Sequence, residues 1–161
     1  MMSTIKTNAI QTTSGKIILQ STGSIIQVVF GSSTDANSAG ANTWINSPAS
    51  VTITPTSSSN KIMIFADLPN NYSGQGSDIY LRLLRNGSAV NANYYSTQGY
   101  SNTTNEGSKR FNMNYQYLDS PASTSAVTYQ VQSYKAGGAT YYVNYPSDRG
   151  THSIVAMEVS A

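Results

Sequence analysis

Residues 111–118 read Phe-Asn-Met-Asn-Tyr-Gln-Tyr-Leu, and this alternation decides the fold class. Successive side chains of a β-strand point to opposite faces, so an apolar residue at every second position gives one buried face and one hydrated face. The same period of two returns in residues 128–134 (Thr-Tyr-Gln-Val-Gln-Ser-Tyr) and in residues 51–54 (Val-Thr-Ile-Thr), which stop at Pro55. These segments predict half-buried strands of antiparallel sheets.

Turn residues divide the remaining chain into further short segments. Asn86-Gly87 is a strong hairpin signal because both residues tolerate positive φ, and Gly137-Gly138 marks a second turn. We expect further strands at 25–30, 44–45, 61–66, 79–85, 89–95, 140–145 and 154–159, and loops at 31–42, 67–77 and 96–109. The most apolar segment, 61–66, is predicted to be a central strand, and the apolar strand 154–159 is predicted to lie inside a sheet, since an exposed apolar edge invites aggregation. About eight to ten short strands without a helix predict an all-β sandwich, jelly roll or barrel.

Length and composition set the protein class. The chain has 161 residues, which suits one domain, and it has no cysteine, which excludes disulfides, thiolate chemistry and cysteine-based zinc sites. Charged residues make up 10% of the chain, against roughly 25% in ordinary domains. Hydroxyl and amide side chains replace them, and together with 12 tyrosines they favour strands over helices.

Nucleic-acid binding and membrane insertion are not expected. The net charge is +2, and Lys109-Arg110 is the sole adjacent basic pair in the sequence, whereas a phosphate-binding surface needs a basic stripe. No apolar run reaches the roughly 18–20 residues of a membrane span, and the N-terminus lacks the apolar stretch of a secretory signal.

The sequence contains few residues that could serve in catalysis. His152 is the single histidine, it has no flanking nucleophile motif, and a histidine at the start of a strand is more often a surface or interface residue. The acidic residues are sparse and mostly at turn positions, although two of them meeting in space could still serve a glycosidase. We therefore predict no enzymatic activity, no cofactor and no metal.

Two sets of motifs resemble a module of phage tail and fibre proteins found in marine and cyanobacterial phages. The first set opens the chain, as Ile-Lys-Thr-Asn-Ala-Ile-Gln-Thr-Thr-Ser-Gly-Lys at residues 5–16 and Ser-Thr-Gly-Ser-Ile-Ile-Gln-Val at 21–28. The second set comprises residues 51–55, 57–62, 118–121 and 154–159. The strand spacing also resembles the ten-stranded jelly roll of the complement C1q and tumour-necrosis-factor-like fold. The resemblance implies a jelly-roll virion component, a homotrimer and no catalysis.

The domain organisation follows from these patterns. Residues 27–161 are predicted to form the jelly-roll domain, and residues 1–26 have too few large side chains to fold alone. Residues 1–26 are either a flexible tail or, as we favour, an extended arm that orders against a neighbouring chain and attaches the protein to other virion proteins.

The aromatic residues provide the candidate contact sites. Tyrosines expected in or beside polar loops are candidates for contact with a host-surface glycan or protein: Tyr72, Tyr94, Tyr95 and Tyr100. Tyrosines expected in strands would pack in the core or, as candidate trimer-interface residues, between subunits: Tyr115, Tyr117, Tyr129 and Tyr141. Trp44 is expected to anchor its strand to the core rather than to form a platform for a sugar.

Three functions remain open at this stage. The favoured one is a trimeric jelly-roll module of a tail fibre or spike tip that binds a host surface. The alternative is a capsid decoration, cement or collar protein that its N-terminal arm holds without an external ligand. The third is a stand-alone lectin or depolymerase. The first two imply a location in the virion, after assembly in the host cytoplasm.

Overall fold

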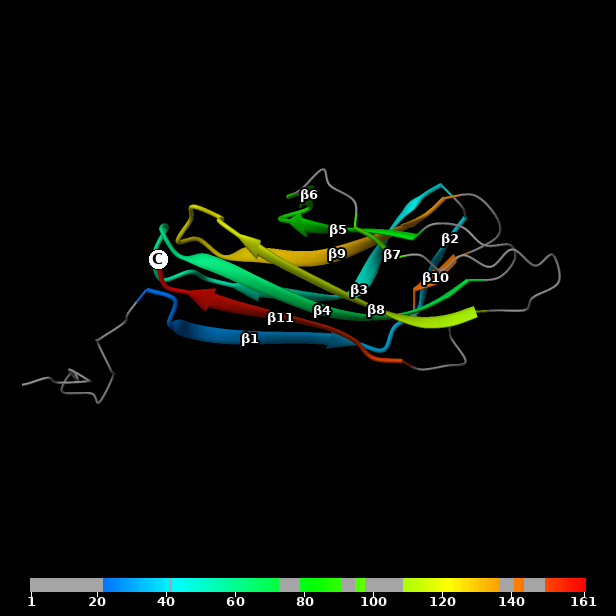
Figure 1. Cartoon of the computed structure of the whole chain (residues 1–161), viewed down its shortest axis with the longest axis horizontal. Helices are drawn as coiled ribbons and strands as arrows, with labels where there is room; N and C mark the ends of the chain where they lie inside the picture. Colours follow the sequence, from blue (N-terminus) through cyan, green and yellow to red (C-terminus); the bar gives the residue numbers. More distant parts are fainter. Residues whose placement is uncertain are drawn as a thin grey trace, which may run out of the picture.

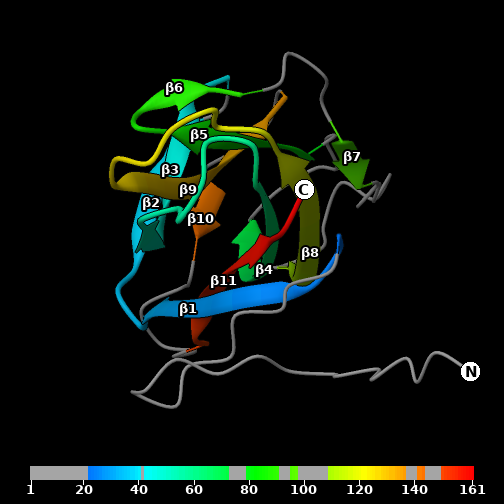
Figure 2. The ribbon, with the colours of Figure 1, turned by 90° about the vertical axis from the view of Figure 1, so that its left-hand side faces the viewer.

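Two antiparallel β-sheets packed face to face make up the described part of the chain (Figure 1). The computed structural model describes residues 22–40, 42–72, 79–90, 95–97, 109–136, 141–143 and 150–161. These residues form strands and turns and contain no helix. Seen from the end in Figure 2, β1, β11, β4 and β8 form one layer and β3, β9 and β5 the other.

Each sheet combines strands that are distant in sequence. The first sheet has six strands, in the order β1-β11-β4-β10-β2 with β8 also paired to β4: β1 (Ile25–Ser33), β2 (Asn37–Ala39), β4 (Lys61–Tyr72), β8 (Lys109–Asp119), β10 (Tyr141–Val143) and β11 (His152–Val159). The second sheet has five strands, in the order β3-β9-β5-β6 with β7 also paired to β5: β3 (Trp44–Ile53), β5 (Ile79–Arg85), β6 (Ser88–Ala89), β7 (Tyr95–Thr97) and β9 (Val127–Lys135).

The connections give the sandwich a jelly-roll topology. The chain passes from β3 in the second sheet to β4 in the first, back to β5, and later from β8 to β9 and on to β10 and β11. The first strand, β1, pairs with the last strand, β11. These crossings between sheets, with the chain ends on adjacent strands, are typical of jelly rolls. The structure confirms the predicted all-β sandwich.

The core lies between the two sheets and is formed by every second residue of the long strands. Burial alternates along β9 and β11, as the period of two in the sequence predicts. The fully buried apolar side chains include Ile53, Ile62, Ile64, Leu68, Ile79, Leu81, Leu83, Met113 and Ile154. The predictions that residues 61–66 form a central strand and that 154–159 lie inside a sheet are confirmed, since β4 and β11 are each paired on both sides.

Strand β3 joins two segments that the sequence analysis separated. It runs from Trp44 to Ile53 through Pro48, and its register against β9 shifts between Asn46 and Ser50. Three residues lie between Asn46 and Ser50 in β3, whereas one residue lies between their partners, Gln132 and Gln130, in β9. A bulge of this kind accommodates a proline, because the bulged residues do not donate to the ladder.

Gly31 lies where β1 passes over this bulge. A Cβ atom at Gly31 would lie 2.0 Å from the backbone oxygen of Ser50, in the opposite sheet. We expect Gly31→Ala to lower the free energy of unfolding by about 1–3 kcal/mol, because backbone must move to admit the methyl group. Urea denaturation measures this, with Gly40→Ala as the control, since a Cβ at Gly40 meets nothing within 4 Å. Equal stability of the two variants would refute the close approach.

Several loops were predicted where the structure has strands. The first part of the loop expected at residues 67–77 is a strand, because β4 continues to Tyr72 and pairs with β8 there, and residues 73–78 lie outside the described part. Strand β2 and the last two residues of β7 lie in stretches that were predicted to be loops. Of the strand expected at 89–95, Ala89 lies in β6, Val90 lies outside a strand, Tyr95 begins β7, and residues 91–94 lie outside the described part. These strands depend on distant partners rather than on local alternation.

The two ends of the described chain lie side by side. The backbone nitrogen of Gly23 donates to the oxygen of Ser160, and the nitrogen of Ser160 donates to the oxygen of Ser24, each at 2.9 Å. We call this the terminal end of the sandwich, at the left of Figure 1. The sheet therefore begins at Ile25, two residues before the predicted domain boundary, and residues 1–21 of the predicted arm lie outside the described part.

Candidate functional site

The outer face of the first sheet carries a band of apolar side chains across four adjacent strands. In one row, Val28 pairs with Met157, Met157 with Met63, and Met63 with Leu118. In the next row, Phe30 pairs with Val155, Val155 with Phe65, and Phe65 with Gln116. Here, the term apolar band refers to Val28, Phe30, Met63, Phe65, Leu118, Val155 and Met157.

Four of the seven residues of the apolar band are exposed in the single chain, and the other three, Met63, Val155 and Met157, are half-buried. Phe30 is 63% exposed, Val28 56%, Leu118 43% and Phe65 41%. Single exposed apolar residues are ordinary, but a contiguous patch of large side chains marks an interaction surface. The sequence held a signal for it, since strands 61–66 and 154–159 are apolar at both odd and even positions, as strands covered on both faces are.

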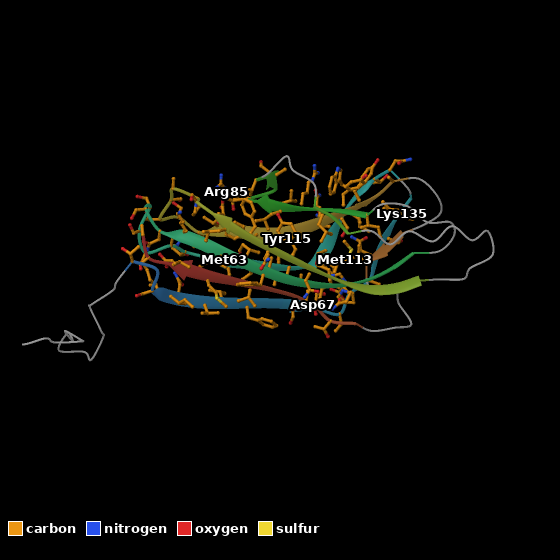
Figure 3. All side chains as sticks on the ribbon, in the orientation of Figure 1. Met63, Asp67, Arg85, Met113, Tyr115 and Lys135 are labelled. Carbon is orange, nitrogen blue, oxygen red and sulfur yellow. The ribbon has the colours of Figure 1, made fainter. Side chains whose placement is uncertain are left out.

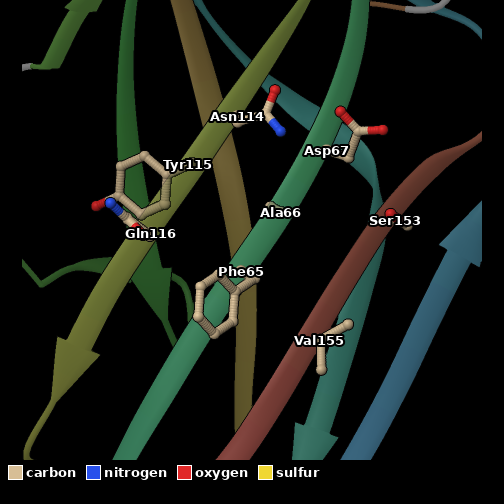
Figure 4. A pocket seen from close by; sticks show the side chains of 8 residues that line it. All are labelled: Phe65, Ala66, Asp67, Asn114, Tyr115, Gln116, Ser153 and Val155. Atoms are coloured by element: carbon tan, nitrogen blue, oxygen red, sulfur yellow. The ribbon is translucent and has the colours of Figure 1, made fainter.

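A shallow hollow of about 300 Å³ lies on this sheet, between β8, β4 and β11 (Figure 4). Phe65 and Val155 of the apolar band line one side, and a polar row of Asp67, Asn114 and Ser153 lines the other. The hollow is therefore apolar on one side and polar on the other, and its lining includes no histidine, lysine or arginine.

The outer face of the second sheet carries a cluster of aromatic side chains and one arginine, which we call the aromatic patch: Trp44, Tyr80, Arg82 and Tyr134. Tyr134 of β9 pairs with Trp44 of β3 on one side and with Tyr80 of β5 on the other. The ring of Tyr134 lies 5.2 Å from that of Trp44 and 5.9 Å from that of Tyr80, centroid to centroid, and both pairs are tilted.

Arg82 connects the aromatic rings to a row of amides. Its guanidinium carbon lies 4.0 Å from the centroid of the Trp44 ring, a cation–π contact. Its Nε donates to Oε1 of Gln132 at 2.7 Å, and Nε2 of Gln132 donates to Oδ1 of Asn46 at 2.6 Å. These bonds hold the side chains of this row in fixed positions on the sheet surface.

Trp44 does not anchor β3 to the core, contrary to the sequence analysis. Ile45 is buried and takes the core position, so the neighbouring Trp44 points to the opposite face of the sheet. Ile45 lies six residues before Val51, an even number, so the period of two in β3 places both on the buried face and Trp44 on the opposite one. The polar stretch Asn46-Ser47-Pro48 hid this orientation, because it looks like a loop that breaks the strand.

Two of the predicted trimer-interface tyrosines lie inside one chain. Tyr115 is 3% exposed and Tyr129 is 0% exposed, both within the core between the sheets. Because a partner subunit cannot reach these side chains, the interface prediction is wrong for Tyr115 and Tyr129, and they have the core role instead. Tyr117 is half-buried and packs against the core.

The remaining predicted tyrosines are described only in part. The backbones of Tyr72 and Tyr141 pair directly, in β4 and β10, so Tyr72 is a strand residue and not a loop residue. The backbone of Tyr95 pairs with that of Leu81 in β7 and β5. The side chains of Tyr72, Tyr95 and Tyr141, and the whole of Tyr94 and Tyr100, lie outside the described part, and their predicted contacts stay predictions.

His152 is fully buried, which corrects its expected surface position. Its Nε2 lies 2.9 Å from the carbonyl oxygen of Pro69, which can only accept, so Nε2 carries the proton. Its Nδ1 then accepts from the Ser47 hydroxyl at 3.0 Å. Burial lowers the pKa of His152 to about 4, against weaker opposing effects of the Pro69 carbonyl and the Asp67 charge.

Ser47 and His152 lie as close together as a catalytic nucleophile and its general base, but their environment does not suit catalysis. Ser47 is 1% exposed and His152 is 0% exposed, so a substrate reaches neither. A carbonyl, and not a carboxylate, orients the imidazole, and the lowered pKa makes it a weak base. The pair joins β3, β4 and β11, which supports a structural role.

Two networks of polar side chains connect the strands at the terminal end of the sandwich. Arg85 places one terminal nitrogen 3.1 and 3.0 Å from the two carboxylate oxygens of Asp119, and the Tyr129 hydroxyl donates to Asp119 at 2.7 Å. These residues come from β5, β8 and β9, so the network connects the two sheets. Burial and the Asp119 carboxylate raise the pKa of Tyr129, which keeps its hydroxyl protonated as the donor.

The second network surrounds Glu158, which is buried. Its carboxylate accepts from Asn60 at 2.6 Å, Gln27 at 2.6 Å, and the backbone and hydroxyl of Thr56 at 2.7 and 2.8 Å. Burial opposes its ionisation, but these hydrogen bonds outweigh it and lower the pKa of Glu158. The turn before β4 is thereby attached to the last strand.

Neither a metal site nor a membrane-spanning helix is found in the residues that the structure describes. In those ranges no three His, Cys, Asp or Glu side chains gather closely enough to bind an ion. No helix there has the length and hydrophobicity needed to cross a bilayer.

Comparisons with known proteins assign the chain to no family. No protein-family model and no curated protein sequence matches it. Among solved structures, the chain is similar to that of the infectious bursal disease virus Gt strain, with 15% identity and a TM-score of 0.45. It is also similar to the VP2 subviral particle of infectious bursal disease virus, with 15% identity and a TM-score of 0.44. Each of these two matches covers 95% of this chain and 42% of the viral chain. A match to dimeric latent PorU from Porphyromonas gingivalis has 13% identity and a TM-score of 0.32, and covers 94% of this chain and 14% of the other. The chain thus spans less than half the length of the viral proteins that it matches.

Proposed function

We propose that this chain is a non-enzymatic structural protein of a phage virion, a jelly-roll subunit that assembles as a homotrimer through the apolar band. The observation that carries the proposal is the exposure of large apolar side chains of this band on the outer face of the first sheet. Burying a large apolar side chain contributes about 1.5–3 kcal/mol, so several such residues per subunit provide a substantial driving force for association. The three-fold state and the virion location rest on the sequence motifs at residues 5–28 and 154–159.

The position of the band suits subunits that pack around a common axis. The band crosses the four neighbouring strands β1, β11, β4 and β8. Strands β1 and β8 lie at its two edges. Closed assemblies bury such a surface on every subunit at once. The hollow beside Phe65 offers a complementary place for a partner's apolar side chain.

Within the virion, we place the protein at a tail fibre or spike tip with a role in host-surface binding. The alternative, a capsid decoration or collar protein, draws support from the terminal end, where Thr22 is bonded to Ala161 and Gly23 to Ser160, so the described chain begins and ends at the same end of the sandwich. An arm that leaves at one end can attach to other virion proteins. A cryo-EM map of the intact particle distinguishes these positions, by three-fold density at a fibre tip or by density across capsomers.

Phe30→Asp tests the subunit interface. We expect the wild-type protein to have a mass of about 52 kDa in multi-angle light scattering, three times 17.2 kDa, and the variant to have the mass of one chain. A buried carboxylate without a partner is too costly for the interface to form. Phe30 is 63% exposed in one chain, so the variant should still fold.

Ser88→Asp, on the exposed β6 of the second sheet, is the matched control and should remain trimeric. A monomeric wild-type protein would overturn the homotrimer, and a trimeric Phe30→Asp variant would overturn the placement of the interface on the apolar band.

A further inference from the structure

We infer that the aromatic patch on the second sheet binds an acidic glycan, one whose pyranose units carry carboxylates. This inference rests on the proposed role in host-surface binding and gives that role a site and a ligand class. Its members, Trp44, Tyr80, Arg82 and Tyr134, face outward from three adjacent strands of one sheet.

The rings supply the surface on which a sugar stacks. Tyr80, Trp44 and Tyr134 are half-buried side chains on the outer face of the second sheet. Tyrosine and tryptophan join an apolar face to a polar edge, which matches the C–H face and the hydroxyl rim of a pyranose. The 44° and 56° tilts between neighbouring rings make a stepped surface, which suits a chain of sugar rings better than one flat ligand.

The amides beside the rings supply hydrogen bonds to sugar hydroxyls. Asn46 and Gln132 lie in the row next to the rings, and the Tyr134 hydroxyl donates to Asn42 at 3.1 Å. Asn46 is exposed, and its amide oxygen already accepts from Gln132, which orients it before any ligand arrives. Polar groups that are fixed in advance lower the entropic cost of binding.

Arg82 selects an anionic ligand. Its Nε is bonded to Gln132 and its plane lies over Trp44, so the guanidinium is held in place. Among the described residues, none accepts a hydrogen bond from its terminal nitrogens, which leaves these donors for a carboxylate in the paired geometry that arginine favours. Strands β3, β5 and β9 contain no Asp or Glu, so no acidic residue of these strands opposes an anion there.

The location of the patch fits a role in contact with a target. Tyr80 lies near the start of β5 and Tyr134 near the end of β9, next to Lys135, whereas Arg85 of β5 lies at the terminal end. Figure 3 shows Lys135 and Arg85 toward opposite ends of the sandwich. The patch is therefore remote from the terminal end, where Gly23 pairs with Ser160.

The test uses Trp44, the single tryptophan, as the reporter. The full-length protein is titrated with oligogalacturonate, and with neutral galactan oligosaccharides of the same length, while tryptophan fluorescence is recorded. We expect saturable binding of the acidic oligosaccharide, at least tenfold weaker binding of the neutral one, and at least tenfold weaker acidic binding by Arg82→Gln. The Tyr134→Ala variant should lose binding of both the acidic and the neutral oligosaccharide. Isothermal calorimetry repeats each titration independently of tryptophan fluorescence.

The Phe30→Asp variant separates this inference from the proposed function. All members of the patch come from one chain, so the variant should bind a short oligosaccharide as tightly as the wild-type protein does, whatever its oligomeric state. A folded wild-type trimer that binds neither oligosaccharide would overturn the glycan site and leave the structural role intact. Equal binding of both oligosaccharides, unaffected by Arg82→Gln, would overturn the acidic specificity.

Discussion

Replacing Asp119 with alanine is expected to lower the free energy of unfolding by about 3 kcal/mol, since breaking a buried ion pair typically costs about 3–5 kcal/mol. Asp119 is 3% exposed and holds Arg85 and Tyr129 from two other strands. The Arg85 side chain is 35% exposed and regains water, which places the cost at the lower end of that range. The Tyr129 hydroxyl is buried and loses its acceptor.

The double variant Asp119→Ala/Tyr129→Phe separates the contribution of the Tyr129 hydroxyl to the free energy of unfolding from that of the Asp119 carboxylate. Tyr129→Phe alone should cost about 1–2 kcal/mol, as a hydrogen bond to a charged acceptor is lost. In the Asp119→Ala background it should cost little or nothing, because no acceptor remains. Urea denaturation at one fixed protein concentration measures all four proteins, since subunit association also contributes to stability.

Asp35→Ala is the control for a general effect of removing a carboxylate. Asp35 is exposed on the surface, so the change should be within about 0.5 kcal/mol. Additive costs for Asp119→Ala and Tyr129→Phe would contradict the network described for the terminal end.

Acidification is expected to destabilise the protein by about 3 kcal/mol between pH 7 and pH 4 through His152 alone. Its pKa is about 4 in the folded chain against 6.5 as the ordinary value, so the unfolded chain binds more protons in this window. The stabilisation is therefore fully present above pH 6.5 and is lost as pH falls toward 4. The size follows from about 1.4 kcal/mol for each of roughly 2.5 pH units.

His152→Gln removes this titration and keeps a donor for the Pro69 carbonyl. The variant should be less stable than the wild-type protein at pH 7, and its free energy of unfolding should fall by about 3 kcal/mol less between pH 7 and pH 4. Asp67, whose charge faces His152, remains in both proteins. Glu158 also remains, and since its pKa is lowered, its contribution is lost only as pH falls below its ordinary value of 4.5. Parallel pH profiles for the two proteins would show that His152 is not buried as described.

Much of the fold was predictable because alternation is a local property of the sequence. Residues 128–134 and 111–118 are strands in the structure, and the apolar segment 61–66 occupies the predicted central position. Strand ends and short strands were less predictable. β4 continues through Pro69 to Tyr72 because β8 pairs with it there, and no residue within that stretch indicates a partner that begins at Lys109.

The candidate sites show the same division between local and distant information. By itself, the sequence determined that the chain forms an antiparallel sandwich with aromatic side chains on its strands, because a period of two dictates both strand and face. Only the tertiary structure decided which strands are neighbours. That choice aligned Phe30, Val155 and Phe65 into one exposed band, brought Trp44, Tyr134 and Tyr80 together, and buried Tyr129 and His152. The physical reason is that register between distant strands depends on the packing of the whole core, and alternation within one strand carries no information about its partner.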